Sequence, residues 1–499
     1  MIPATDAAQR ATFRLLLACL AAAWTLALAM AVVSAPDAHP DEKFHLAAGR
    51  YYLDHWLPPR VDDATLRPSL SAYGYSYLGD VDVSYFLAGK VARVGGVAIA
   101  SESLRLRAFN LLLFAALIAV YAWRRDAFSP IVLVLLTPQV WYVFSYCNND
   151  ALPLFLALLV ADALFGARAR IGEALTGPWR AASLIPLAGC GVLLGLLVLT
   201  KSNYLPFLGF VGFLALWNAA GFAPAAIAVG GAGLYLAEAR GFFAVPEPLA
   251  ILALAGGVAA VAIAAALRAW RSPALRTALL RGALVALAAF WIAAPPLLYD
   301  RAVNGDAETK NTALSALAEA HADPKYRPST ASDPDTAFWG LRLRDKGLSL
   351  VDILSPPWSW GTKTWKSFTG YYGYVTIKSP FAYYAAIFAV YVALAGWVVR
   401  TLFVAGTPQD RPLLAVACGF GGGCVLLSLY HSWVNDFQAQ GRYLFPVLAI
   451  AAIPFARAAI RFDARDVRIV RALLAIAFVL SAFSFGHRGL RRIPKALGA

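Results

Sequence analysis

The stretch Leu15–Val33, which reads LLLACLAAAWTLALAMAVV, decides the fold class of this chain. It carries no charge and is close to the roughly 20 apolar residues that a helix needs to cross a bilayer. Arg10 and Arg14 precede it, and basic residues beside a span favour the cytoplasmic side. Ser34-Ala35-Pro36 after it is a poor cleavage site for a signal peptide. We therefore predict a retained first span with a cytoplasmic N-terminus.

Similar apolar runs recur along the whole chain of 499 residues, of which 60% are hydrophobic and 14% are charged. A soluble domain carries about 25% charged residues. This composition predicts an all-α integral membrane protein with about 11–13 transmembrane helices, forming a single membrane domain over residues 1–499. We expect the further spans near 106–123, 128–145, 151–166, 183–199, 204–219, 222–238, 248–267, 282–299, 380–399, 412–430, 443–458 and 472–486.

The formal net charge of +14 is explained by cytoplasmic loops and by contact with anionic headgroups of membrane lipids. We therefore expect membrane lipids, and no nucleic acid, as partners of the basic residues. The five scattered cysteines form no C-x-x-C pair, which argues against a zinc site or a disulfide framework. Walker A, Rossmann, H-E-x-x-H and G-x-S-x-G motifs are absent, so ATP-driven transport and the common hydrolase classes lose support.

Two long polar segments, 36–105 and 300–379, interrupt the apolar pattern. The basic loops between spans predict that both segments lie outside, the first as a long loop with interfacial helices and the second as an insert. The predicted spans themselves are nearly free of charge, and ionisable residues gather at their ends. Because functional residues concentrate in loops held by a rigid scaffold, we expect the functional site at the outer boundary of the membrane.

The first candidate motif is His39-Pro40-Asp41-Glu42-Lys43-Phe44-His45, just after the first span. A spacing of four puts Asp41 and His45 on one face of a helix. A carboxylate beside histidine can act as a general base or bind a metal, and Asp41 with Glu42 could ligate a divalent cation. The alternative is helix capping, since acidic residues at a helix N-terminus favour the macrodipole.

Two further candidates lie at the outer ends of predicted spans. Asn148-Asn149-Asp150 could bind substrate or simply cap the next helix. Lys201 is predicted to lie on the outer side, so the preference of basic residues for the cytoplasmic side does not explain it. It could bind phosphate or extend its amine to the lipid headgroups.

The last candidates lie late in the chain. Gln440-Gly441-Arg442-Tyr443 begins an apolar segment, where a cation is costly unless paired; a guanidinium fork there suits phosphate. Tyr371 and Tyr374 belong to the Gly/aromatic stretch Phe368-Thr369-Gly370-Tyr371-Tyr372-Gly373-Tyr374. Such aromatics suit sugar faces and equally suit a membrane-interface belt.

These pieces in this order resemble the GT-C superfamily of polytopic membrane glycosyltransferases, and more narrowly a bacterial branch described as a domain of unknown function. The resemblance implies a sugar donor linked to polyprenyl phosphate and a glycan or lipid acceptor at the outer face of the bacterial inner membrane. It makes Asp41 the general base, with Glu42 as the second acid of the motif. Tyr371 and Tyr374 depart from the residues expected in the Gly/aromatic stretch.

The chemistry that this resemblance implies assigns the remaining candidates. Lys201, Arg442, Gln440 and Tyr443 would hold the donor phosphate, and direct displacement by the acceptor would invert the anomeric centre. Some GT-C enzymes use a divalent cation and others do not, so a cofactor is left open.

Three other readings stay open. An O-antigen polymerase or ligase would share lipid-linked substrates and outer arginines, although the early acidic motif favours a transferase. A lipid or solute transporter or flippase would place polar residues in mid-span and show internal repeats, which we do not find in the sequence. A non-catalytic scaffold in envelope assembly is not excluded.

Overall fold

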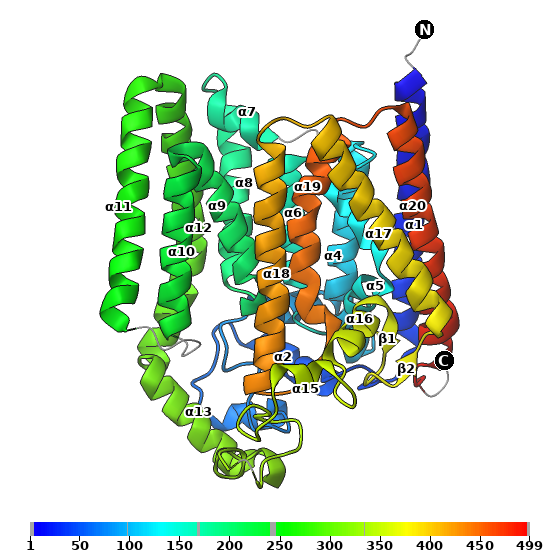
Figure 1. Cartoon of the computed structure of the whole chain (residues 1–499). Coiled ribbons are helices and arrows are strands. Elements are labelled where there is room, and N and C mark those ends of the chain that lie inside the picture. Colours follow the sequence, from blue (N-terminus) through cyan, green and yellow to red (C-terminus); the bar gives the residue numbers. More distant parts are fainter. Residues whose placement is uncertain (1–3, 97, 167–169, 240–245, 334, 497–499) are drawn as a thin grey trace.

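The computed structural model describes residues 4–96, 98–166, 170–239, 246–333 and 335–496. Within these residues the secondary-structure elements are all α, 3-10 or π helices apart from one two-stranded antiparallel sheet. Ten of the described helices are long and apolar enough to cross a bilayer, and they stand side by side as a bundle (Figure 1). The chain is therefore a multi-pass, all-α membrane protein, as its composition predicts.

Six of the candidate spans are the single helices α1 (Ala4–Val33), α4 (Glu102–Arg124), α11 (Glu247–Arg271), α12 (Pro273–Asn304), α17 (Phe381–Val404) and α18 (Asp410–Val434). The other four reach their length together with a short 3-10 or π turn beside them, and their helices are α8 (Leu184–Val198), α9 (Leu205–Ala220), α19 (Phe445–Ala459) and α20 (Ala464–Phe483). The apolar helix α10 (Phe222–Ala239) is not among the ten. The shorter helices are α2 (Glu42–Asp54), α3 (Val83–Gly95), α5 (Pro138–Ser145), α6 (Ala151–Phe165), α7 (Arg170–Thr176), α13 (Ala307–His321), α14 (Pro328–Ala331), α15 (Leu350–Leu354) and α16 (Trp360–Gly370). The strands are β1 (Tyr371–Tyr372) and β2 (Ile377–Lys378).

The number of spans differs from the predicted 11–13 because three expected segments, 128–145, 151–166 and 222–238, do not form candidate spans among the described residues. Segment 128–145 forms a 3-10 helix at Pro130–Leu136 and then α5, with Thr137 capping α5 and Pro138 at its first position. Every residue of both pieces is buried. Helix α6 has 15 residues, which at about 1.5 Å per residue is shorter than the hydrocarbon layer of about 30 Å. Broken helices are tolerated at membrane depth where protein surrounds them.

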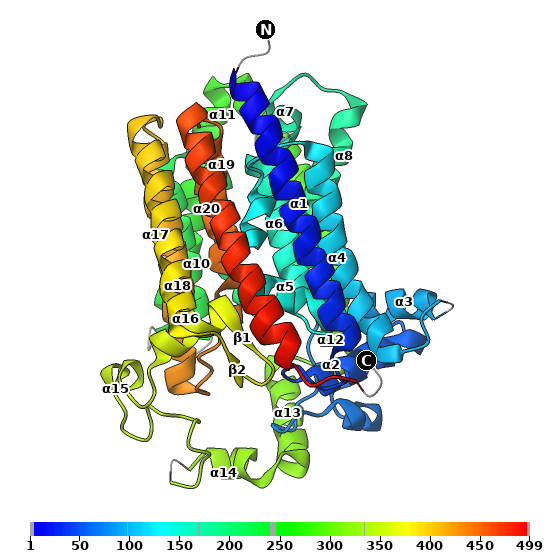
Figure 2. The same cartoon turned by 90° about the vertical axis from the view of Figure 1, so that its right-hand side faces the viewer.

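The two polar segments gather at one end of the bundle, which we call the loop end (Figures 1 and 2). Helix α1 begins at the opposite end. The tail after α20 reaches the loop end, where Ser34 forms a β-bridge with Lys495. The last helix therefore runs the full length of the bundle, and the basic tail lies beside the end of α1.

Candidate functional site

Asp41 lies in the turn between α1 and α2, and its backbone has a left-handed conformation with φ 59° and ψ 8°. Such a conformation is uncommon outside glycine, although Asp tolerates it better than most residues. The Asp41 side chain makes no capping hydrogen bond to α2. Its carboxylate is 40% exposed and lies 3.6 Å from Nη2 of Arg442. Asp41 therefore occupies the N-cap position of α2, as the capping alternative places it, but its carboxylate pairs with Arg442 and makes no capping hydrogen bond.

Arg442 lies in the 3-10 turn Gly441–Leu444 that leads into α19. Gly441 fixes this turn against α16, because a Cβ atom at this position would overlap the backbone of Phe368. The Gly441 amide also donates a hydrogen bond to Ser367 Oγ at 2.6 Å. The glycine of the Gln-Gly-Arg-Tyr sequence thus allows the close backbone approach that holds Arg442 opposite Asp41.

Asp150 and Lys201 extend this contact into an ion network, which we define as Asp41, Arg442, Asp150 and Lys201. Lys201 Nζ lies 2.6 Å from Asp150 Oδ1, and Arg442 Nη1 lies 3.7 Å from Asp150 Oδ2. The Asp150 side chain is 1% exposed, so its charge needs both cations. Among the described residues, neither Arg442 Nε nor Asp150 Oδ2 has a hydrogen-bond partner. The guanidinium is thus attracted to two carboxylates and still has donor capacity left.

His45 follows Asp41 by one helical turn, as the spacing predicts, but it is buried. Its Nδ1 lies 2.7 Å from the Tyr85 hydroxyl, and its ring stacks on Tyr77 with centroids 4.3 Å apart. Burial lowers the pKa of His45 well below 6.5, and the positive charges of Arg442 and Lys201 lower it further. His45 is therefore a neutral ring that packs against Tyr77 and Tyr85 beside the site.

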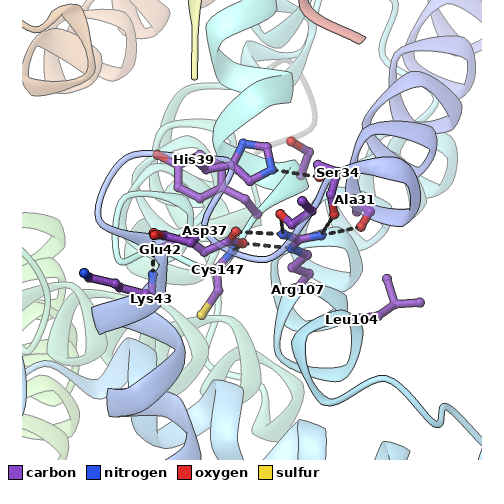
Figure 3. Close-up of polar contacts among 12 residues, drawn as sticks. Ala31, Ser34, Asp37, His39, Glu42, Lys43, Leu104, Arg107 and Cys147 are labelled. Carbon is purple, nitrogen blue, oxygen red and sulfur yellow. Dashed lines mark hydrogen bonds and ion pairs between the residues drawn. The ribbon is translucent and has the colours of Figure 1, made fainter. Parts of the chain in front are cut away.

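Glu42 is fully buried and faces Arg107 (Figure 3). The Arg107 guanidinium donates to both carboxylate oxygens, and the Cys147 amide donates to Glu42 Oε1 at 3.2 Å. This geometry gives Glu42 a structural role in place of the catalytic one expected from the sequence. Both carboxylate oxygens of Glu42 are thus bound by Arg107. Among the described residues, no three His, Cys, Asp or Glu side chains gather to hold a metal ion.

The two asparagines before Asp150 have separate roles. Asn148 Oδ1 accepts the amides of Asp150 and Ala151, so it caps the start of α6 as one of the two readings proposed. Asn149 Nδ2 donates to Asp82 Oδ2 at 2.8 Å. Asp82 lies next to the ion network. No sequence motif contains Asp82, so the sequence did not predict this carboxylate as part of the site.

A narrow pocket opens beside Arg442, and its volume of about 20 Å³ corresponds roughly to one water molecule. Of the predicted residues, Tyr371, Gln440 and Arg442 line it. The other lining residues, most of which the sequence did not mark, are Pro40, Gln139, Tyr142, Tyr146, Ser367, Gly373, Val375 and Gly441. The pocket therefore joins the first loop, α5, α16 and the turn before α19.

Two predicted tyrosines lie beside this pocket without lining it. The Tyr374 hydroxyl donates to Asp37 Oδ1 at 2.7 Å. The Tyr443 hydroxyl donates to Gln438, while the Lys201 amine lies 5.0 Å from the centre of the Tyr443 ring. Tyr443 therefore helps to position Lys201 through its ring.

No protein-family model, curated protein or solved structure matches this chain. The fold and the site together define a multi-pass helical membrane protein with a buried ion network at the loop end of its bundle.

Proposed function

We propose that this protein is a membrane glycosyltransferase that moves a sugar from a polyprenyl-phosphate donor to a glycan or lipid acceptor. The observation that carries this proposal is the contact between Asp41 and Arg442, 3.6 Å apart at the end of the bundle where the loops gather. A carboxylate that can take a proton and a cation that can bind phosphate are the two groups that such a transfer needs in one place.

Asp41 is the general base in this proposal. A sugar or lipid hydroxyl is a poor nucleophile, so a carboxylate must remove its proton as the oxygen attacks the anomeric carbon. Asp41 is 40% exposed, so an acceptor hydroxyl can reach it. The bond from the anomeric carbon to the phosphate oxygen breaks as the new bond forms on the opposite face, and the anomeric centre inverts.

Arg442 and Lys201 stabilise the negative charge that develops on the leaving phosphate. Arg442 keeps free donor capacity at Nε, and a guanidinium matches phosphate with two parallel N–H donors. Asp150 holds both cations in position through contacts of 2.6 and 3.7 Å. Without a phosphate the network is neutral, with two carboxylates and two cations.

The pocket beside Arg442, at about 20 Å³, has no room for a sugar ring. We therefore expect donor binding to move the segments that close the pocket, namely the first loop around Pro40 and the turn that contains Gly373 and Val375. Loop rearrangement on binding is common where a site must exclude water.

We assign the loop end to the outer face of a bacterial inner membrane and the N-terminus to the cytoplasm. The support is the positive-inside rule. Basic residues gather at the end of the bundle where α19 finishes and α20 begins, and they include Arg457, Arg461, Arg465 and Arg468.

The test is transfer from a radiolabelled polyprenyl-phosphate sugar in membranes that contain the full chain. Asp41→Asn keeps the size of the side chain and removes the base, so we expect the rate to fall by about 10²-fold or more. Asp62→Asn is the matched control, because Asp62 lies in the same loop and forms an exposed ion pair with Arg60, away from the ion network. Unchanged transfer by Asp41→Asn would remove Asp41 from the mechanism.

A further inference from the structure

A second cavity, of about 510 Å³, lies between the first loop segment and two helices of the bundle, α8 and α12. This volume is in the range of small-molecule and lipid sites. The cavity shares no lining residue with the pocket beside Arg442. Its walls are Tyr52, Trp56, Leu57, Pro58, Asp80, Val81, Asp82, Val83, Phe86, Leu196, Leu199, Ile292, Pro295, Pro296 and Tyr299.

The cavity lies at the membrane boundary. Leu196 and Ile292 belong to candidate spans. Leu196 lies close to the end of α8, and Tyr299 lies close to the end of α12 that reaches the loop end, with Ile292 about two turns deeper in the bundle. On the loop side, Trp56 is 68% exposed and the Lys90 amine lies 4.2 Å from the centre of its ring. An exposed tryptophan beside a lysine is typical of the zone between hydrocarbon and headgroups. Lipid chains are therefore the apolar molecules closest to this cavity.

Two carboxylates, Asp80 and Asp82, interrupt the otherwise apolar walls. Among the described residues, no Lys or Arg lies within 4.0 Å of either carboxylate, and nearby Lys310 pairs with Asp300 at 2.8 Å. Asp82 accepts hydrogen bonds from the Ser84 amide and from Asn149. Asp80 is exposed and Asp82 is half-buried. Loss of hydration beside the apolar walls raises the pKa of both carboxyl groups above their usual values, although the charges of Lys310 and Lys201 oppose this shift. No cation in the described part of the chain thus forms an ion pair with either carboxylate, and the Lys310 and Lys201 charges act on them only from farther away.

We propose that this cavity binds a membrane phospholipid by one acyl chain, with the primary ammonium of the headgroup placed between Asp80 and Asp82. An ammonium has three N–H donors, which suffices for two carboxylates, and charge-assisted hydrogen bonds of this kind are the strong ones. A lipid with a net anionic headgroup would bring negative charge to a site that already holds two carboxylates. The lipid site goes beyond the proposed transferase activity and does not depend on it.

The test uses the purified full chain in nanodiscs with photoreactive lipids that carry a diazirine on one acyl chain. Ethanolamine, choline and glycerol phospholipids with identical chains are compared, and the crosslinked peptides are mapped by mass spectrometry. We expect the ethanolamine lipid to label peptides around Trp56, Phe86 and Ile292 about tenfold more than the glycerol lipid. The choline lipid, which lacks N–H donors, should label them weakly.

Variants connect this labelling to the cavity. Asp80→Asn combined with Asp82→Asn should remove the preference for ethanolamine, while Asn at position 82 can still cap α3. Ile292→Trp should fill the cavity and abolish labelling. Leu280→Trp is the matched control, because Leu280 lies on the same helix, is 67% exposed and does not line the cavity.

Three results would overturn the lipid site. They are equal labelling by ethanolamine and glycerol lipids, a preference that survives in the double Asn variant, and displacement of the probe by polyprenyl phosphate but not by ethanolamine lipid. Thermal unfolding of each variant is measured in parallel. If Ile292→Trp does not fold, the Asp80→Asn/Asp82→Asn comparison decides the question by itself. Loss of sugar transfer in an Asp41 variant would leave the lipid labelling unchanged, so the two proposals fail separately.

Discussion

Arg107 and Glu42, which lie 65 positions apart, form a two-point ion pair with Nε–Oε1 and Nη2–Oε2 distances of 2.8 and 2.7 Å. The remaining donors of Arg107 bond the carbonyl groups of Ala31, Ser34 and Ala35. All five N–H groups of the guanidinium therefore have acceptors. The pair joins α4, which carries Arg107, to the first residue of α2, while the other Arg107 hydrogen bonds hold the end of α1. Arg107 thereby fixes the turn that holds Asp41.

Removing one partner of this pair should strongly destabilise the protein. Glu42→Ala leaves the Arg107 charge buried and unpaired, so we expect a loss of about 3–5 kcal/mol, measured as thermal or denaturant unfolding in detergent. Arg50→Ala is the matched control, because Arg50 and Glu102 form an exposed ion pair between the same two helices. Exposed pairs contribute about 0–1 kcal/mol. Equal effects of the two variants would contradict the bracing role of Glu42.

Gly441→Ala should displace Arg442. The added Cβ atom overlaps the Phe368 backbone, so the turn before α19 must move away from α16. We expect transfer to fall at least about tenfold while helix content is kept, because the altered contact is at the site and not in the bundle. Gly361→Ala on α16 is the control, since nothing lies within 4 Å of a Cβ there. Activity of Gly441→Ala equal to that of the control would show that this close approach does not matter.

Arg442→Lys tests the guanidinium apart from its charge. A lysine keeps the positive charge but cannot contact Asp41 and Asp150 at once or offer a fork to phosphate. Hydrogen bonds to charged groups contribute about 1.5–3 kcal/mol each, so we expect transfer to fall between about 10- and 100-fold. The KM for the lipid-linked donor should rise as well. Arg301→Lys, an exposed arginine on α12, should have no effect, and a wild-type rate in Arg442→Lys would exclude a phosphate fork.

The burial of His45 predicts a pH dependence of stability. The folded protein holds the pKa of His45 well below 6.5, whereas the unfolded chain takes up a proton near its usual pKa. Stability should therefore be complete above about pH 6.5 and fall as the pH drops below it, by up to about 1.4 kcal/mol per pH unit. His45→Gln, which can still bond Tyr85, should show a shallower decline in thermal unfolding between pH 7.5 and 5. Parallel curves for both proteins would argue against this origin.

Some parts of the site could be predicted from sequence, because they depend on local spacing or on an unusual residue at the end of an apolar run. Asp41 and His45 lie one helical turn apart at the start of α2, although Asp41 is exposed and His45 is buried. Arg442 stands at the head of an apolar helix, where a cation needs a partner. The role of Glu42 could not be predicted in this way. Its partner Arg107 lies inside a span, and only the packing of α4 against the end of α1 brings the two together.

The sequence by itself determined that this chain crosses the membrane many times and carries its polar segments at the span ends, since length, apolarity and charge are properties of each segment alone. Only the tertiary structure decided which distant residues meet. Asp41 faces Arg442, Glu42 faces Arg107, and segment 128–145 is broken and enclosed by protein. These outcomes depend on how helices pack against one another. The apolar composition of a segment predicts that it is buried in the membrane or the protein, but it does not predict which other segment packs against it.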